Sequence, residues 1–237
     1  MRFFYSMRKE QIKVIAFDAD DTLWVNETYF REAEQKFAQL LSGYETVNKI
    51  DQELFKTEIK NLTLYGYGVK GFMLSMVECA LVISNNNIHP KILNEILTIG
   101  KEMLLKPIEL LEGVEEVLAA LHGKYKLIVA TKGDLLDQER KLEKSGLLKY
   151  FHHIEVMSEK KVPDYKKLIA HLDIESNELL MIGNSLKSDV LPLINVGASA
   201  IHVPFHTTWA HEEVTATASQ NVEYLTINNL KELLSIL

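Results

Sequence analysis

The sequence predicts an α/β protein built on a doubly wound parallel sheet, with a helical domain inserted into it. Five short aliphatic or β-branched segments alternate with longer helical patterns. Several are apolar at consecutive positions, as in Val14–Phe17, which is typical of parallel strands buried on both faces. The interval between the first two segments, 19–125, is far longer than a single crossover needs. A parallel core with an insertion accounts for all three observations.

The predicted strands follow one another with a helix in almost every connection. They are Lys13–Asp18, Lys126–Thr131, His153–Met157, Leu179–Gly183 and Ala200–Pro204. The helices expected to pack on the sheet are Glu115–His122, Leu135–Lys144, Tyr165–Leu172 and Leu186–Val196. Their lengths suit crossovers that bring each strand parallel to the others.

Residues 26–106 form the predicted helical insertion, and residues 1–25 and 107–237 form the core. Two apolar stripes run at helical spacing through the insertion. They are Phe30, Ala33, Phe37, Leu40 and Leu41, followed by Phe72, Met76, Cys79, Ala80 and Ile83. Pro107 is expected at the return to the core.

Composition narrows the functional classes. The chain has 26 basic and 33 acidic residues, a formal charge of −7, which argues against nucleic acid as a partner. No apolar run approaches the roughly 20 residues of a membrane span, and the apolar block within Met1–Glu10 is too short for a secretory signal. The single cysteine, Cys79, cannot form an intramolecular disulfide and is expected in a packed core. A reducing, cytoplasmic location is therefore expected.

The first strand runs into the segment Asp18-Ala19-Asp20-Asp21-Thr22. Ligands of open α/β sheets bind beyond the carboxyl ends of the strands. Several carboxylates at such a place are costly unless a cation or hydrogen bonds compensate them. The segment therefore indicates a binding site, although a simple loop or helix cap would also suit Asp and Thr.

Three later segments complete a series. Thr131 ends the second strand; Lys160 and Lys161 shortly precede the pair Pro163-Asp164. The fourth strand ends at Gly183 and is followed by Asn184-Ser185 and, four residues later, by Asp189. In this order the four segments resemble the signatures of the haloacid dehalogenase superfamily, in its helical-cap class and phosphatase branch. The resemblance spans residues 14–189 and implies a Rossmann-like core with an α-helical cap.

The resemblance implies a role for each position. Asp18 would be the nucleophile that becomes an aspartyl-phosphate, and Asp20 the general acid and base. Thr131 and Lys160 would bind the phosphoryl group, with Lys161 as the alternative lysine. The cofactor would be Mg²⁺, held by Asp18, the backbone carbonyl of Asp20, Asn184 and Asp189.

Two positions distinguish this chain within the superfamily. Asn184 stands where an aspartate is usual; its amide oxygen can still bind Mg²⁺ at lower affinity, or it is a turn residue without that role. Dehalogenases of the superfamily lack an aspartate at the position of Asp20, because a halide leaving group needs no general acid. The presence of Asp20 favours phosphoryl transfer.

Other residues have two interpretations each. Lys132 is expected either to add positive charge near the substrate or to be a solvated loop lysine. Lys70, or Tyr67, either contacts substrate or belongs to a turn between helices. Gly133 is expected at positive φ and Asp134 as the cap of the next helix.

The segment from His202 to Glu213, including the stretch His206–Glu213, also has two interpretations. Its histidines would form a second metal site, or Trp209 would pack the loop onto the core.

The sequence thus predicts a Mg²⁺-dependent phosphatase acting on a small phosphate ester. Sugar phosphates, phosphoglycolate and nucleoside monophosphates all fit. A phosphomutase with the same aspartates and a catalytically quiet binding relative are the alternatives. The substrate and the oligomeric state stay open.

Overall fold

The computed structural model of the chain describes residues 9–214 and 222–237, so most of the segment Met1–Glu10 lies outside the described residues. The chain divides into two compact units. The first comprises residues 1–25, 108–132 and 138–237; the second comprises 26–107 and 133–137. The second unit therefore holds Pro107, which was expected in the core, and a short segment after the second strand.

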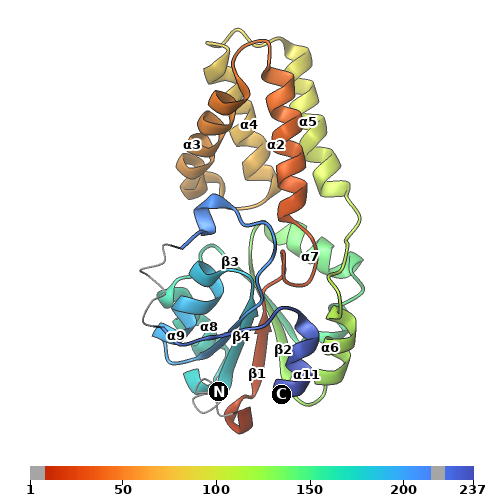
Figure 1. The fold of residues 1–237 in the computed structure, drawn as a ribbon, viewed down its shortest axis with the longest axis vertical. Helices are drawn as coiled ribbons and strands as arrows, with labels where there is room; N and C mark the ends of the chain where they lie inside the picture. Colours follow the sequence, from red (N-terminus) through yellow and green to blue (C-terminus); the bar gives the residue numbers. More distant parts are fainter. Residues whose placement is uncertain (1–8, 215–221) are drawn as a thin grey trace. The chain divides into compact units, whose positions relative to one another are not determined.

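The first unit is built on a six-stranded sheet in the order β3-β2-β1-β4-β5-β6, with every pairing parallel (Figure 1). Its strands are β1 (Val14–Phe17), β2 (Lys126–Lys132), β3 (His153–Met157), β4 (Leu179–Gly183), β5 (Ser199–His202) and β6 (Leu225–Thr226). The doubly wound prediction is confirmed. The two-residue β6 was not predicted, because so short a strand leaves no periodic pattern, and β5 ends two residues before the expected Pro204.

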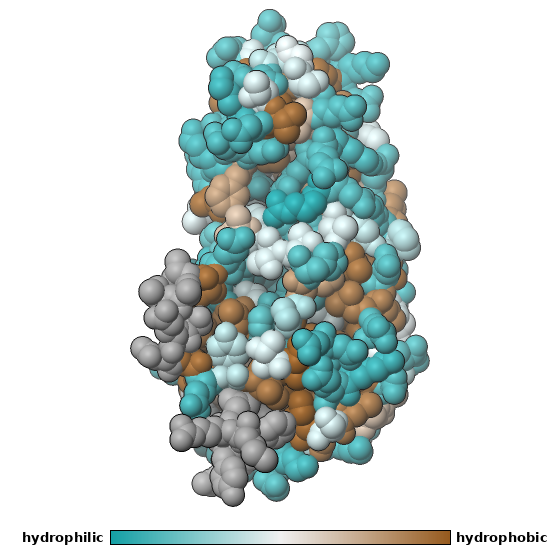
Figure 2. Space-filling view, viewed as in Figure 1, coloured by the Kyte–Doolittle hydropathy of each residue, from teal (hydrophilic) through white to brown (hydrophobic). Residues whose placement is uncertain are grey.

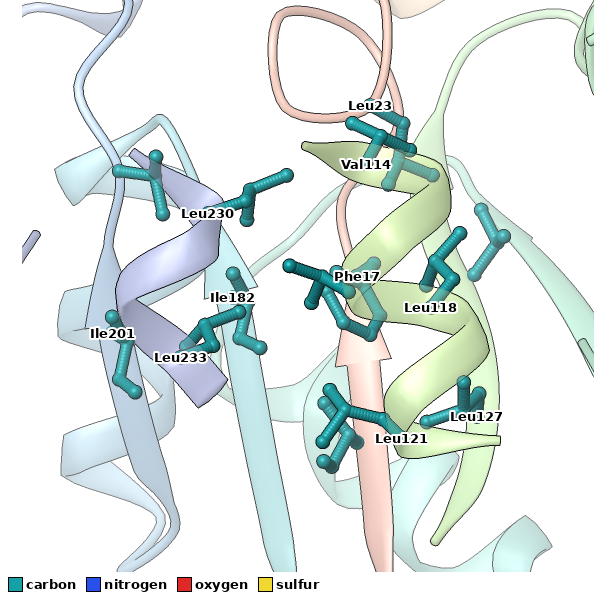
Figure 3. Packing of buried hydrophobic residues seen from close by; sticks show 14 of the residues in the cluster. Phe17, Leu23, Val114, Leu118, Leu121, Leu127, Ile182, Ile201, Leu230 and Leu233 are labelled. Carbon is teal, nitrogen blue, oxygen red and sulfur yellow. The ribbon is translucent and has the colours of Figure 1, made fainter. Parts of the chain in front are cut away.

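Alternate residues of the strands supply two apolar cores. Ile15 and Phe17 face one layer with Leu127 and Ile182, while Val14 and Ala16 face the other. Helices α6 (Val114–Leu121) and α11 (Leu233–Ile236) pack on the first face, as Figure 3 shows. Helices α8 (Val162–Leu172) and α9 (Leu191–Asn195) pack on the second. This two-sided burial explains why the strands are apolar at successive positions.

One predicted crossover has a different backbone. Residues 186–196 were expected to form a single α-helix, but a π-helical turn, η4 (Leu186–Val190), precedes α9. Ser185 Oγ accepts from Ser188 N, and the Asp189 carboxylate accepts from Ser185 N. Such side-chain bonds to local backbone compete with regular α-helical pairing. Other described elements are α7 (Leu135–Lys144) and the 3₁₀ turns η1 (Lys9–Gln11), η2 (Leu148–Tyr150), η3 (Ser176–Glu178), η5 (Ala210–Glu212) and η6 (Leu230–Glu232).

The second unit is a bundle of four helices. They are α2 (Glu27–Leu41), α3 (Val47–Tyr65), α4 (Val69–Ile83) and α5 (Pro90–Leu105). The members of both apolar stripes lie in, or against, one core that includes Phe37, Met76 and the buried thiol of Cys79. Burial raises the pKa of that thiol to about 12. Figure 2 shows mainly hydrophilic residues over the outer face of these helices, as amphipathic packing requires.

Candidate active site

The loop after β1 turns sharply and brings its polar residues to the carboxyl end of the sheet. Asp18 N donates to Ile182 O at 2.9 Å, which extends the pairing of β1 with β4 by one residue. The chain then folds back, since Leu23 N donates to Ala19 O at 2.8 Å. Asp21 takes a left-handed conformation, φ 62°, which aspartate tolerates better than most residues.

Asp18, Lys160 and Asp189 form a buried ionic triad. Lys160 Nζ lies 2.5 Å from Asp18 Oδ1 and 2.6 Å from Asp189 Oδ1. The Lys160 side chain is 1% exposed, whereas that of neighbouring Lys161 is 69% exposed and lies 3.6 Å from Glu159. The contacts therefore single out Lys160 as the lysine beside Asp18.

The environment of the triad brings the pKa of Asp18 close to neutral pH. Burial raises the pKa of Asp18 to about 7, with the Asp189 charge adding to the rise and Lys160 opposing it. Burial by itself would lower the pKa of Lys160, but the charges of Asp18 and Asp189 outweigh it and raise that pKa. Lys160 is thus held as a cation between two carboxylates.

Two oxygen atoms at this site share a single hydroxyl group. Thr22 Oγ1 lies 3.3 Å from Asp18 Oδ2 and 3.4 Å from Asn184 Oδ1, and it accepts from Asn184 N at 3.1 Å. One hydroxyl proton cannot serve both oxygens, so this pair has spare acceptor capacity. A carboxylate and an amide oxygen are ligands that suit Mg²⁺. The residues present therefore fit a hard divalent cation between Asp18 and Asn184.

Both carboxylate oxygens of Asp189 accept hydrogen bonds in the structure. Its Oδ1 accepts from Lys160, and its Oδ2 accepts from Ser185 N at 3.0 Å. A Cβ atom placed on Gly183 would meet Asp189 Oδ2 at 2.3 Å, so the carboxylate packs directly on the backbone. Asp189 thus holds Lys160 and the backbone of its own loop in place.

Asp20 is held apart from the triad by three donors. Trp24 Nε1 and Lys141 Nζ donate to its Oδ1 at 2.7 and 2.9 Å, and Gln138 Nε2 donates to its Oδ2 at 2.8 Å. Lys141 and Gln138 come from α7 and were not predicted as site residues. Their position depends on how α7 packs on the sheet, for which the sequence has no local signal.

The last two residues of β2 complete the polar layer. The buried Thr131 donates to the carbonyl oxygen of Lys132 at 3.2 Å. Lys132 Nζ donates to Glu212 Oε1 at 2.6 Å and to Ser188 Oγ at 3.0 Å. The Lys132 side chain is thus a partly buried ion-pair partner, not a solvated loop lysine, and sequence reasoning missed Glu212.

Gly133 and Asp134 have the backbone conformation and the helix-capping contact that the sequence predicts. Gly133 has φ 135°, and Asp134 Oδ1 accepts from Asp137 N at 3.1 Å at the start of α7. Lys70 Nζ lies 2.8 Å from Asp134 Oδ1. Both residues belong to the helical unit, so Lys70 has a carboxylate partner within its own unit.

A metal site formed by the histidines after β5, one of the two interpretations of that segment, does not assemble among the described residues. His202 Nε2 lies 3.0 Å from the carbonyl oxygen of Asn184, and the His211 ring packs on Trp209 with centroids 4.9 Å apart. Within residues 9–214 and 222–237, the group of ligand-type side chains close enough to share a metal is His153, Glu155 and His171. It begins at the opposite, amino-terminal end of β3.

No helix among the described residues is both long and apolar enough to cross a membrane.

Comparison with known proteins identifies relatives of the chain. It is 27% identical to pyrimidine 5'-nucleotidase YjjG of Escherichia coli (strain K12), over 94% of this chain and 96% of that protein. It is 36% identical to a haloacid dehalogenase-like family hydrolase from Xanthomonas campestris, with a TM-score of 0.80 over 95% of this chain and 92% of that one.

The fold is also found in a more distant structure. The 2-haloacid dehalogenase of Pseudomonas syringae pv. Tomato DC3000 superposes with a TM-score of 0.64 at 16% identity, over 95% of this chain and 97% of that one. A likeness at that identity reports fold alone. Residues 12–197, however, match the family described as haloacid dehalogenase-like hydrolase. The chain therefore belongs to the haloacid dehalogenase-like hydrolase family.

Proposed function

We propose that this hydrolase is a Mg²⁺-dependent phosphatase that cleaves a small phosphate monoester through an aspartyl-phosphate on Asp18. The observation that carries the proposal is the buried triad in which Lys160 contacts both Asp18 and Asp189. A cation at this position stabilises a carboxylate nucleophile and the negative charge of an incoming phosphoryl group.

In the first step, an oxygen of Asp18 attacks phosphorus and the bond from phosphorus to the ester oxygen breaks. The leaving alkoxide takes a proton from Asp20. In the second step, Asp20 takes a proton from water, and that water attacks phosphorus and releases Asp18. Lys141 Nζ lies 2.9 Å from Asp20 Oδ1 and would keep this side chain oriented for both proton transfers.

Other residues bind or orient. Thr131 is proposed to donate to the phosphoryl group, exchanging its present contact with Lys132 O. Asp18 and Asn184 would hold Mg²⁺ with the backbone carbonyl of Asp20. Bound there, the ion neutralises phosphoryl charge that would otherwise repel Asp18. The contacts of Asp189 favour an anchoring role over direct ligation.

The nucleotidase relative suggests the substrate class. At 27% identity over nearly the whole of both chains, it makes a nucleoside 5'-monophosphate our first candidate. Purified protein would be assayed for phosphate release from a broad phosphate-ester panel, with and without Mg²⁺. We expect Mg²⁺-dependent hydrolysis of nucleoside monophosphates and of a generic aryl phosphate. Product analysis with a hexose phosphate separates a phosphomutase from a phosphatase.

The decisive test uses isotopic oxygen and a variant. Single turnover in ¹⁸O-labelled water should place the label in released phosphate, because water attacks phosphorus. Label in the Asp18 carboxylate would indicate attack on the carboxyl carbon, the chemistry of a dehalogenase. Asp18→Asn should lower kcat below detection while leaving the thermal unfolding transition in place. Wild-type turnover by Asp18→Asn would refute the proposal.

A further inference from the structure

Glu212 is a partly buried acid that the proposed reaction does not use. It lies in η5, within the segment that follows β5, and its side chain is 13% exposed. Its Oε1 accepts from Lys132 Nζ at 2.6 Å. Its Oε2 accepts from the hydroxyl groups of Ser185 and Ser188, each at 2.6 Å. All three contacts are short and charge-assisted, which makes them stronger than ordinary hydrogen bonds.

The two serines belong to the loop that carries the proposed metal ligand. Ser185 follows Asn184 directly, and its amide donates to the carboxylate of Asp189. Ser188 N donates to Ser185 Oγ at 3.0 Å, and Ser188 O accepts from the buried Tyr165 hydroxyl at 2.8 Å. Glu212 therefore ties the Asn184–Asp189 loop to β2 through Lys132.

Charge makes the tie strong. Burial alone would raise the pKa of Glu212, but Lys132 and the two serine hydroxyls lower it to about 2. The carboxylate is therefore ionised throughout the range in which an enzyme is assayed. Without it, the partly buried ammonium of Lys132 would lose the carboxylate of Glu212, and the serine hydroxyls would lose their ionised acceptor.

We propose that Glu212 is a positioning residue that holds the Asn184–Asp189 loop in the conformation that binds Mg²⁺, an inference that rests on the proposed function. It acts through Ser185, Ser188 and Lys132 and does not itself contact substrate. Groups that orient metal ligands in this way contribute about 10–100-fold to metal affinity.

The test measures metal binding directly. Mn²⁺, which prefers the same oxygen ligands, would be titrated into the full chain while the signal of free Mn²⁺ is followed by electron paramagnetic resonance. We expect Glu212→Gln to raise the Mn²⁺ dissociation constant about tenfold or more at an unchanged stoichiometry. The neighbouring, exposed Glu213 provides the matched control, and Glu213→Gln should leave the constant within about twofold.

Kinetics give a second readout. In Glu212→Gln the half-saturating Mg²⁺ concentration should rise, while kcat at saturating Mg²⁺ changes less. A merely structural defect would instead lower the number of Mn²⁺ sites per chain and leave their affinity alone. Unchanged Mn²⁺ affinity in Glu212→Gln would overturn the inference.

A double variant keeps the test sharp if Glu212→Gln folds poorly. Lys132→Met with Glu212→Gln removes both charges of the ion pair, so thermal stability should recover towards that of the wild type. Mn²⁺ affinity should stay weak, because the serines still lack an ionised acceptor. Recovery of wild-type affinity would overturn the positioning role. Wild-type protein that binds Mn²⁺ without hydrolysing phosphate esters would contradict the proposed function alone; failure to bind Mn²⁺ would contradict both.

Discussion

Two glutamates of similar burial, one in each unit, have pKa values shifted in opposite directions. Glu212 in the sheet unit has its pKa lowered to about 2, because Lys132 and two serine hydroxyls outweigh the effect of burial. Glu58 in the helical unit has its pKa raised to about 8, first by burial and then by the charges of Glu34 and Glu27. The difference lies in the partners that each unit supplies.

In the helical unit, the nearby cation Arg31 contacts other glutamates. Arg31 donates to Glu27 at 2.6 Å and to Glu34 at 2.8 Å, so its guanidinium reaches Glu58 only as a more distant charge. In the sheet unit, Lys132, Lys141 and Lys160 each make a direct contact with a carboxylate of the candidate site. A direct cationic partner thus distinguishes Glu212, whose pKa is lowered, from Glu58, whose pKa is raised.

Removing Lys160 should have the largest effect. Lys160→Met leaves Asp18 and Asp189 buried without their shared cation, and such a loss costs about 3–5 kcal/mol. Urea unfolding at pH 8 measures the change, and turnover should vanish with it. Lys161→Met, at the adjacent exposed lysine, should shift stability by less than about 0.5 kcal/mol. Equal effects of the two substitutions would mean that the triad does not stabilise the fold.

Asp20→Asn should act on rate, with a smaller effect on stability. The amide keeps the shape of the side chain but cannot transfer the proton, so kcat should fall about 10²–10⁴-fold. Steady-state kinetics with an aryl phosphate measures the loss, and the thermal unfolding midpoint serves as the control. A fall of less than about tenfold would remove Asp20 as general acid and base.

Gly183→Ala tests the packing beneath the triad. The new Cβ would meet the whole Asp189 side chain, with Oδ2 at 2.3 Å and Cβ at 2.6 Å. We expect a loss of about 1–3 kcal/mol in unfolding free energy, together with lower activity, because Asp189 must shift away from Lys160. Gly43→Ala is the matched control, since nothing lies within 4 Å of a Cβ there. Wild-type stability and activity of Gly183→Ala would contradict this account of Asp189.

Glu58→Gln should have the smallest effect, with a defined pH dependence. Its folded-state pKa of about 8 lies above the ordinary value of 4.5, so the stability of the wild type falls as pH rises between these values. The amide removes that penalty. It should stabilise the protein by about 1 kcal/mol at pH 8.5 and by little at pH 4.5.

Thermal unfolding at the two pH values measures this difference. The control is Glu102→Gln, whose side chain is 57% exposed, and it should show no such pH dependence. A stabilisation by Glu58→Gln that is the same at both pH values would show that its charge is not the cause.

Much of the fold could be predicted because its signals are local. β3, β4 and α7 have the predicted boundaries, since aliphatic runs and helical periodicity are properties of short segments. Where side chains bond back to their own backbone, as Ser185 and Asp189 do before α9, periodicity alone predicted a plain helix and was wrong.

By itself, the sequence determined the sheet, its helical insertion and the order of polar segments at the carboxyl ends of the strands. Each of these depends on neighbouring residues and on the geometry of parallel strands. Only the tertiary structure decided which charges meet. Lys160 reaches two carboxylates while Lys161 reaches solvent, and Glu212 finds Lys132 across 80 residues. These contacts depend on how segments that are distant in the sequence pack together, and no local sequence pattern specifies that packing.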